Sequence, residues 1–439
     1  MDSVAATAHD LDPMSWRRLR GFKGLVHDAV DHVTELVADG HESTARTVMK
    51  VLGAVPPIAG PAQVVNDVRR AATFGWLGAI RSVNRAVETV TDAGLDLALP
   101  ETSAEPALVP MRSNAMKSAT WVGDAALGLV NGALGDALHA KDNGLALGMQ
   151  LRSGDAFLPH GGDAIRAALP ASGDKLAVFV HGLGTTEWSW CLGAEEYHGD
   201  ASTSFATLLA KDLGYVPVFA RYNTGRHVSE NGRLLADAIE RVQKARPFEE
   251  ITLVGHSMGG LVSRSACHAA SEGGLAWVKR VKHVISLGSP HRGAPLEKVG
   301  HVLTAVLGAI DTPGTRIPAR ILAGRSAGIK DLRHGALVDE DWLGQDLDAL
   351  WTPGAPRARE IPLLPWASYH FISATVTEDP DHAVGRLLGD LLVRVPSASG
   401  EAMTHAVFPI ETKHFGGVMH HQLQNHPAVY EQLRAALTP

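Results

Sequence analysis

The serine at the centre of Gly255-His256-Ser257-Met258-Gly259 has the G-x-S-x-G pattern of a nucleophile elbow. An apolar, β-branched run over 251–254 leads into it, and a segment of small and apolar residues follows. In such an elbow the serine stands on a sharp turn from strand to helix, where only glycines fit beside it. The turn lifts the hydroxyl out of the sheet towards a base and an oxyanion pocket. The pattern therefore predicts that Ser257 is a covalent nucleophile.

The same five-residue pattern occurs again around Ser326, in a chain of 439 residues that holds 45 glycines. The preceding run 317–323 contains a proline and an arginine, which a central strand would not accommodate. The residues that follow, 329–331, do not start an apolar helix. Because a motif counts only in its structural context, we interpret Ser326 as a loop residue that matches by chance.

Acyl transfer by a serine also needs a base, a group that orients the base, and donors for the developing oxyanion. The run 181–184 reads His-Gly-Leu-Gly and follows an apolar segment, 175–180. Backbone N–H groups can face outward in such a turn. We expect the N–H groups of Leu183 and Met258 to form the oxyanion hole, and an ordinary glycine turn after a strand is the alternative.

The acid and the base should follow the serine along the chain, in that order. Spacing alone does not choose among the acidic candidates, which are Asp379, Asp381 and Asp390. Four histidines crowd the C-terminal segment and compete as the base: His414, His420, His421 and His426. No H-E-x-x-H motif and no cysteine pair accompanies them. Because a serine triad needs no metal, we expect neither a metal nor another cofactor.

The composition excludes some other classes of protein. The formal net charge of −7 offers no electrostatic footprint for nucleic acid. The two cysteines, Cys191 and Cys267, cannot build a disulfide framework. The N-terminus lacks the basic start and apolar core of a secretory signal, and the most apolar window, 120–138, is interrupted by charges. We therefore expect a cytoplasmic protein.

From residue 174 onwards, short apolar runs alternate with helical patterns, which predicts parallel strands with helices on both faces of the sheet. The expected strands are 175–180, 216–220, 251–254, 282–287 and 369–376. The expected helices are 204–213, 231–244 and 259–270. The stretch 294–366 breaks the rhythm, because it is rich in Pro, Gly and Trp. We predict that it is an insertion that lies over the site as a lid, with Trp342, Trp351 and Trp366 as apolar surface.

The region 1–165 differs in character and is expected to be α-helical. Apolar residues recur at helical spacing over 22–37 and 64–90, and a segment rich in small residues spans 115–138. Such a region could be a platform that packs on the neighbouring domain or in a homo-oligomer. It could instead be an amphipathic surface that docks on a membrane or a lipid inclusion. The predicted domains are thus 1–165 and 166–439.

The stretch 175–435 resembles the α/β-hydrolase superfamily, and in particular bacterial triacylglycerol lipases and GPI inositol-deacylase-like esterases. The resemblance rests on HGLG at 181–184, GHSMGG at 255–260 and GSPHRG at 288–293. It also rests on GDLLV at 389–393, which leads into a serine as in those lipases, and on the tail 420–430.

Carried over residue by residue, the resemblance implies a triad of Ser257, Asp390 and His420. Two departures keep alternatives open: Gly-Asp-Leu-Leu replaces the more usual Asp-Gly-Leu, and His421 adjoins His420. Asp379 remains the second candidate for the acid.

The implied activity is that of a serine carboxylester hydrolase, which attacks small-molecule or lipid esters with apolar acyl groups. A thioesterase or an intracellular polyester depolymerase would use the same residues. A non-catalytic protein that binds a lipid or a partner could also keep this fold.

Overall fold

The computed structural model describes residues 21, 23–24, 110–113, 118–293, 326–344, 358–375, 377–379, 390, 393, 395–398 and 410–438. The chain divides into two compact units, one of 1–107 with 142–145 and one of 108–141 with 146–439. Only the second unit is described at length. The predicted helices over 22–37 and 64–90 lie almost entirely outside the described residues, and so does most of the predicted lid.

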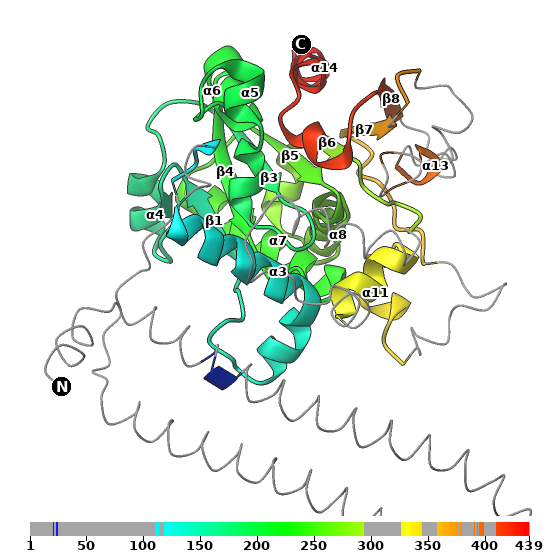
Figure 1. Cartoon of the computed structure of the whole chain (residues 1–439). Coiled ribbons are helices and arrows are strands. Elements are labelled where there is room, and N and C mark those ends of the chain that lie inside the picture. Colours follow the sequence, from blue (N-terminus) through cyan, green and yellow to red (C-terminus); the bar gives the residue numbers. More distant parts are fainter. Residues whose placement is uncertain are drawn as a thin grey trace, which may run out of the picture. The chain divides into compact units, whose positions relative to one another are not determined.

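An eight-stranded sheet forms the centre of the second unit, in the order β2-β1-β4-β3-β5-β6-β7-β8 (Figure 1). The strands are β1 (Gln150–Ser153), β2 (Ala156–Phe157), β3 (Lys175–Val180), β4 (Tyr215–Arg221), β5 (Glu250–His256), β6 (Val281–Leu287), β7 (Ser368–Thr375) and β8 (Ile410–Gly416). All neighbours from β4 to β8 pair in parallel, whereas β1 is antiparallel to β2 and β4. The predicted mostly parallel sheet is confirmed.

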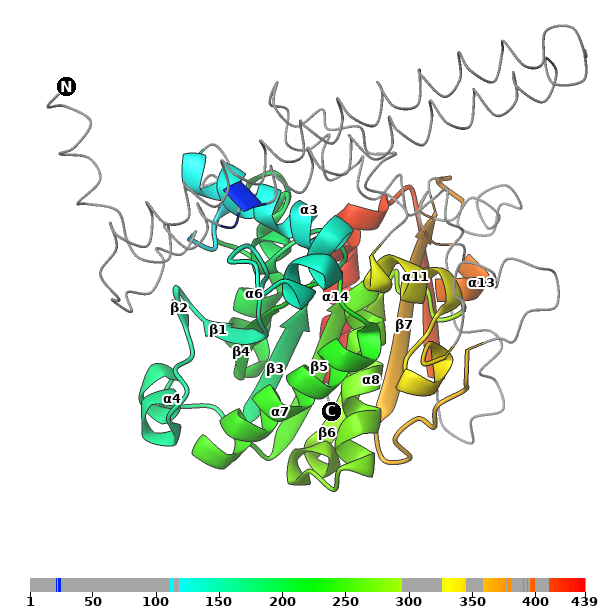
Figure 2. The same cartoon turned by 90° about the horizontal axis from the view of Figure 1, so that it is seen from below.

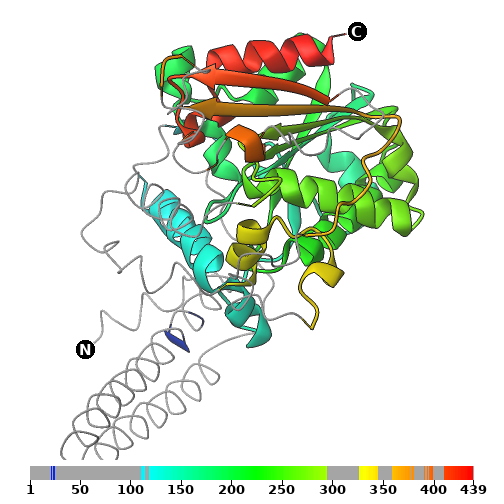
Figure 3. The same ribbon diagram turned by 90° about the vertical axis from the view of Figure 1, so that its right-hand side faces the viewer.

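Helices cover both faces of the sheet (Figures 2 and 3). The α-helices of the described residues are α3 (Ala119–Ala140), α4 (Gly162–Ala168), α5 (Ala194–His198), α6 (Phe205–Leu213), α7 (Val228–Ala245), α8 (Met258–Glu272), α11 (Ala327–His334), α13 (Val395–Ala398) and α14 (Pro427–Leu437). Helices α7 and α8 lie on one face, and α6 and α14 lie on the other.

The continuous apolar runs of the strands follow from this arrangement. Successive side chains of a strand point to opposite faces, and here both faces are covered. In β3, Leu176, Val178 and Val180 enter the core beneath α7 and α8, while Ala177 and Phe179 enter the core beneath α6 and α14. All five of these side chains are fully buried.

Helix α6 shows how local sequence sets the ends of an element. Ser204 accepts a hydrogen bond from the N–H of Thr207, and the Thr207 hydroxyl accepts one from the N–H of Ser204. This capping box satisfies two N–H groups that the first turn leaves without partners. Gly214 ends the helix in the left-handed conformation, with φ of 71°. The predicted helix 204–213 therefore begins and ends where its sequence signals stand.

Part of the region before residue 165 belongs to the same unit as the sheet. Helix α3 packs its Trp121 edge-on against Trp188, with ring centroids 4.8 Å apart. Strands β1 and β2 extend the sheet beyond β4. The predicted boundary at 165 thus falls inside the second unit, which begins at Leu108. Among the described helices, none combines the length and the apolar character that crossing a bilayer requires.

Candidate active site

Ser257 stands at the turn between β5 and α8. Its backbone has φ of 53° and ψ of −121°, a conformation that costs a non-glycine residue about 1–3 kcal/mol. The N–H of Ser257 donates to the carbonyl of Leu287, at the end of the neighbouring β6 (2.8 Å). The side chain is 5% exposed. The strained turn therefore places this hydroxyl at the carboxyl end of the central strands.

Close approach of α8 to the sheet explains the glycines around Ser257. A Cβ on Gly255 would lie 2.4 Å from the nitrogen of Gly260, and a Cβ on Gly259 would lie 2.1 Å from the carbonyl oxygen of Val180. Neither position has room for a side chain. The glycines are thus required by contact between α8, β5 and β3, as the elbow pattern predicts.

The structure brings Asp390 and His420 together. Nδ1 of His420 lies 2.7 Å from Oδ2 of Asp390, and both side chains are buried. The other carboxylate oxygen accepts a hydrogen bond from the N–H of Val393 (2.8 Å). Because a carboxylate can only accept, Nδ1 carries the proton and Nε2 of the neutral ring is an acceptor. Nε2 is buried and has no hydrogen-bond partner among the described residues.

Two contacts link His420 to the strands beside Ser257. A Cβ on Gly288, the residue after β6, would lie 3.0 Å from Nδ1 and Cε1 of the His420 ring. Nε2 of His256 lies 3.1 Å from the carbonyl oxygen of His420, which can only accept. His420 is therefore held both by the residue that precedes Ser257 and by the strand end to which the N–H of Ser257 is bonded.

The turn 181–184 lies against the elbow. A Cβ on Gly182 would lie 3.1 Å from the Cβ of Ser257. The N–H groups of Leu183 and Met258 donate no hydrogen bond within the described part of the chain. Met258 is the first residue of α8, where a helix leaves N–H groups without intrahelical acceptors. The turn 181–184 and the first turn of α8 thus each have a backbone donor without a partner in this part of the structure.

Residues 219–310 match the family described as the PGAP1-like alpha/beta domain. This range contains the elbow and the turn that follows β6. Together with the parallel sheet and the elbow at the end of β5, the match supports the fold that the sequence resemblance predicted. The chain has the α/β-hydrolase fold. No curated protein matches this α/β-hydrolase significantly in sequence.

Several solved structures are similar to this α/β-hydrolase. A lipase of Bacillus licheniformis is 19% identical and covers 62% of this chain and 94% of its own, with a TM-score of 0.39. A lipase-esterase related protein of Clostridium acetobutylicum is 18% identical, with coverages of 61% and 96% and a TM-score of 0.36. A thioesterase of the prodiginine biosynthetic pathway in Streptomyces coelicolor is 19% identical, with coverages of 61% and 86% and a TM-score of 0.36.

The alternative acid and base of the α/β-hydrolase lie in different surroundings. Asp379 and His421 are exposed, whereas Asp390 and His420 are buried against each other. Two further histidines of the tail have contacts of their own. His414 shares a hydrogen bond with the hydroxyl of Ser373, and Nδ1 of His426 accepts from the N–H of Ala428 at the start of α14.

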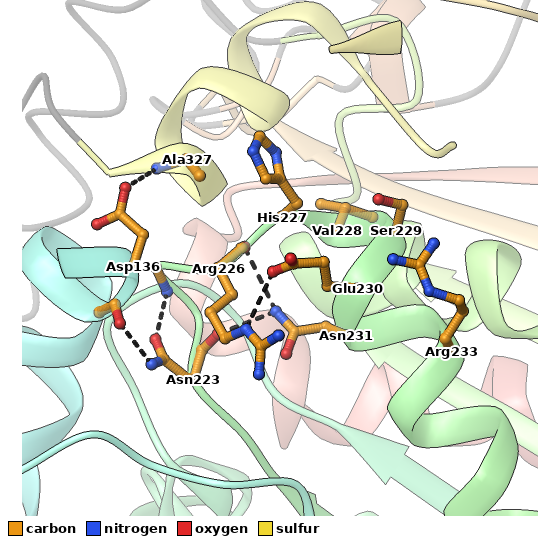
Figure 4. A network of polar contacts seen from close by, with 12 residues as sticks. Asp136, Asn223, Arg226, His227, Val228, Ser229, Glu230, Asn231, Arg233 and Ala327 are labelled. Atoms are coloured by element: carbon orange, nitrogen blue, oxygen red, sulfur yellow. Dashed lines mark hydrogen bonds and ion pairs between the residues drawn. The ribbon is translucent and has the colours of Figure 1, made fainter. Parts of the chain in front are cut away.

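Ser326 does not lie in a loop, as its sequence context had suggested, but caps α11. Its hydroxyl accepts from the N–H of Ile329 (3.3 Å) and donates to the carbonyl of Gly132 in α3 (2.7 Å). Next to it, the N–H of Ala327 donates to Asp136 (2.8 Å; Figure 4). The backbone of Ser326 is extended, with φ of −70° and ψ of 149°. This serine therefore starts a helix and forms no elbow.

Replacing Ser326 by alanine removes this N-cap and should lower the free energy of unfolding by about 1 kcal/mol. Chemical denaturation of Ser326→Ala measures the loss. The exposed Ser271 in α8 provides the control, because its alanine variant should change stability by no more than about 0.5 kcal/mol. A stability of Ser326→Ala equal to that of the unaltered protein would contradict the capping role.

The sequence reasoning missed the buried histidine before the nucleophile. Desolvation of His256, together with the nearby His420, lowers its pKa well below the usual value. The ring is therefore neutral at neutral pH, and Nε2–H can serve as the donor to the His420 carbonyl. Nothing in a single sequence distinguishes such a supporting histidine from one that takes part in proton transfer.

Proposed function

We propose that this α/β-hydrolase is a serine carboxylester hydrolase that uses Ser257, His420 and Asp390 as its triad. The observation that carries the proposal is the buried Asp390–His420 pair at 2.7 Å, whose Nε2 is left without a partner beside the strained elbow. Acyl transfer requires a base that a carboxylate orients and a hydroxyl that lies near this base, and here the hydroxyl stands on the strained turn of the elbow.

In this mechanism Ser257 attacks the ester carbonyl while Nε2 of His420 takes the hydroxyl proton. His420 then returns the proton to the leaving alcohol, and an acyl-enzyme remains on the Oγ atom. Water repeats the sequence, and the acid product leaves. Asp390 holds the imidazole with Nδ1 protonated and stabilises the charge that the ring carries between these steps.

The N–H groups of Leu183 and Met258 would stabilise the oxyanion in both tetrahedral intermediates. Backbone donors fixed before the reaction do not have to reorient as charge develops, which makes this a large contribution to the rate. The substrate class that we propose is an ester with an apolar acyl group, offered as a small molecule or as a lipid. The required chemistry involves no metal or other cofactor.

Covalent labelling tests the proposal. A fluorophosphonate should modify the protein with a stoichiometry of one, and peptide mapping should find the label on Ser257. Hydrolysis of p-nitrophenyl esters of graded chain length then measures the acyl preference, with matched thioesters and a polyester suspension as further substrates. A label on another residue, or no reaction with any acyl substrate, would overturn the proposal.

A further inference from the structure

Helix α3 contacts the oxyanion turn through a buried group of charges. Asp124 of α3 accepts a hydrogen bond from the hydroxyl of Thr186 (2.6 Å) and pairs with Arg221 at the end of β4 (2.8 and 3.0 Å). Glu187, the next residue after Thr186, pairs with the same guanidinium through both oxygens (2.6 and 2.7 Å). A second guanidinium, that of Arg152 in β1, donates to Glu187 (2.9 Å).

These four side chains form a balanced set with almost no contact with water. The side chains of Arg152 and Glu187 are 0% exposed, and those of Arg221 and Asp124 are 3% and 6% exposed. Burial would raise the pKa of Glu187, but the two guanidinium groups outweigh it and lower the pKa to about 2. A charge group of this kind tolerates little rearrangement, because moving one member leaves another buried without its partner.

Two glycines of α3 contact the backbone of the oxyanion turn. A Cβ on Gly132 would lie 2.8 Å from the Cα atom of Gly184, and a Cβ on Gly128 would lie 3.1 Å from the carbonyl oxygen of Gly184. Gly184 follows Leu183 directly and has φ of 71°. Its N–H donates to the hydroxyl of Thr224, in the loop after β4 (3.1 Å). The turn is therefore held between α3 and that loop.

The second half of α3 is itself fixed to both neighbouring segments (Figure 4). The side-chain amide of Asn223 donates to the carbonyl of Gly135 (2.8 Å), and Asp136 accepts from the N–H of Ala327 (2.8 Å). Because α3 is fixed at these points, it can hold the segment that it contacts in one position. The segment in question is 184–187, which continues directly from the proposed oxyanion donor Leu183.

We propose that α3 is a positioning element of the oxyanion turn, in which Asp124 fixes Thr186 and the surface of Gly128 and Gly132 sets the position of Gly184. The proposal rests on the proposed function, because it concerns the Leu183 donor of the same site. It gives a part of the first 165 residues an indirect, positioning role in catalysis. None of these α3 residues touches the reacting atoms, so their effect reaches the reaction only through the turn.

Gly132→Ala tests the contact with Gly184. The added methyl group must displace the turn, and we expect kcat to fall by about tenfold or more with KM changed by no more than about twofold. Affinity for an alkylboronic acid, which forms a tetrahedral adduct on the serine, should fall in step with kcat/KM. Gly123→Ala is the matched control, since this exposed position of α3 has no atom within 4 Å of an added Cβ.

Thr186 allows a test that leaves α3 unaltered. Thr186→Val removes the hydroxyl that Asp124 accepts from and should lower kcat in the same way, whereas Thr186→Ser keeps a hydroxyl and should restore most of the rate. A role in stability alone would lower the melting temperature of Thr186→Val without changing kcat of the folded protein or its boronic acid affinity. That result would overturn the proposal.

The unaltered protein separates failure of this proposal from failure of the proposed function. If it neither hydrolyses esters nor takes the fluorophosphonate on Ser257, the proposed function is wrong and the positioning role falls with it. If it does both, and Gly132→Ala and Thr186→Val keep full kcat and boronic acid affinity, only the positioning role is wrong.

Discussion

Replacing Ser257 by alanine should lower kcat for ester hydrolysis by about 10⁶-fold, because the covalent step then has no nucleophile. Steady-state hydrolysis of the best p-nitrophenyl ester measures this loss. Labelling by a fluorophosphonate should disappear in the same variant. The fold should be kept, since the strained backbone at φ of 53° does not depend on the hydroxyl.

Ser326→Ala is the matched control for this experiment, because Ser326 lies in the chain's other G-x-S-x-G pattern. Its hydroxyl caps α11 and contacts α3, so the variant should lose some stability and keep the covalent label on Ser257. Ester hydrolysis that survives Ser257→Ala would show that the elbow is not the source of the activity. If the label is lost in Ser326→Ala but kept in Ser257→Ala, the nucleophile is Ser326 and not Ser257.

Replacing Asp390 by asparagine should lower kcat by about 10⁴-fold while the site keeps its shape. The carboxylate oxygen that lies 2.7 Å from Nδ1 of His420 can only accept, and it holds the proton on Nδ1. An asparagine amide in its place can donate, which favours the tautomer with the proton on Nε2. In that tautomer the nitrogen that should receive the serine proton is already occupied. Ester hydrolysis by purified Asp390→Asn measures the effect.

The matched control is Asp379→Asn, which changes an exposed carboxylate in the segment after β7. Its kcat should remain within about twofold of the unaltered protein, as is usual for a surface change away from the reacting groups. If Asp379→Asn is inactive and Asp390→Asn is active, the acid of the triad is Asp379, and the proposed role of Asp390 is wrong.

The elements that could be predicted are those whose local signals and burial agree. The strand 175–180, which is buried from Leu176 onwards, was predicted with its observed ends, and the helix between Ser204 and Gly214 was marked by both caps. Strand β8 was missed because it pairs on one side only and carries exposed polar residues, so its sequence IETKHFG lacks an apolar run. Strands β1 and β2 were too short to stand out within a region that was expected to be helical.

In the proposed site, too, only the residues with a local sequence signal could be predicted from the sequence alone. The elbow could be predicted because a steric rule ties its glycines to a local turn. The choice of Asp390 and His420 needed the family resemblance, since five other residues met the same rule of order along the chain. The buried charges around Glu187 had no local signal at all. Asp124 and Arg221 are 97 positions apart, and each looks like an ordinary surface charge when read alone.

The same buried charges determine where this domain can be separated from the rest of the chain. A fragment that starts at residue 166 would lack both Asp124 and Arg152, and Arg221 and Glu187 would each lose a buried partner. It would also lack β1, so that β4 would become an open edge of the sheet. We therefore expect a fragment that keeps the helix beginning at Ala119 to be more stable than one that starts at residue 166, although both contain the whole family match.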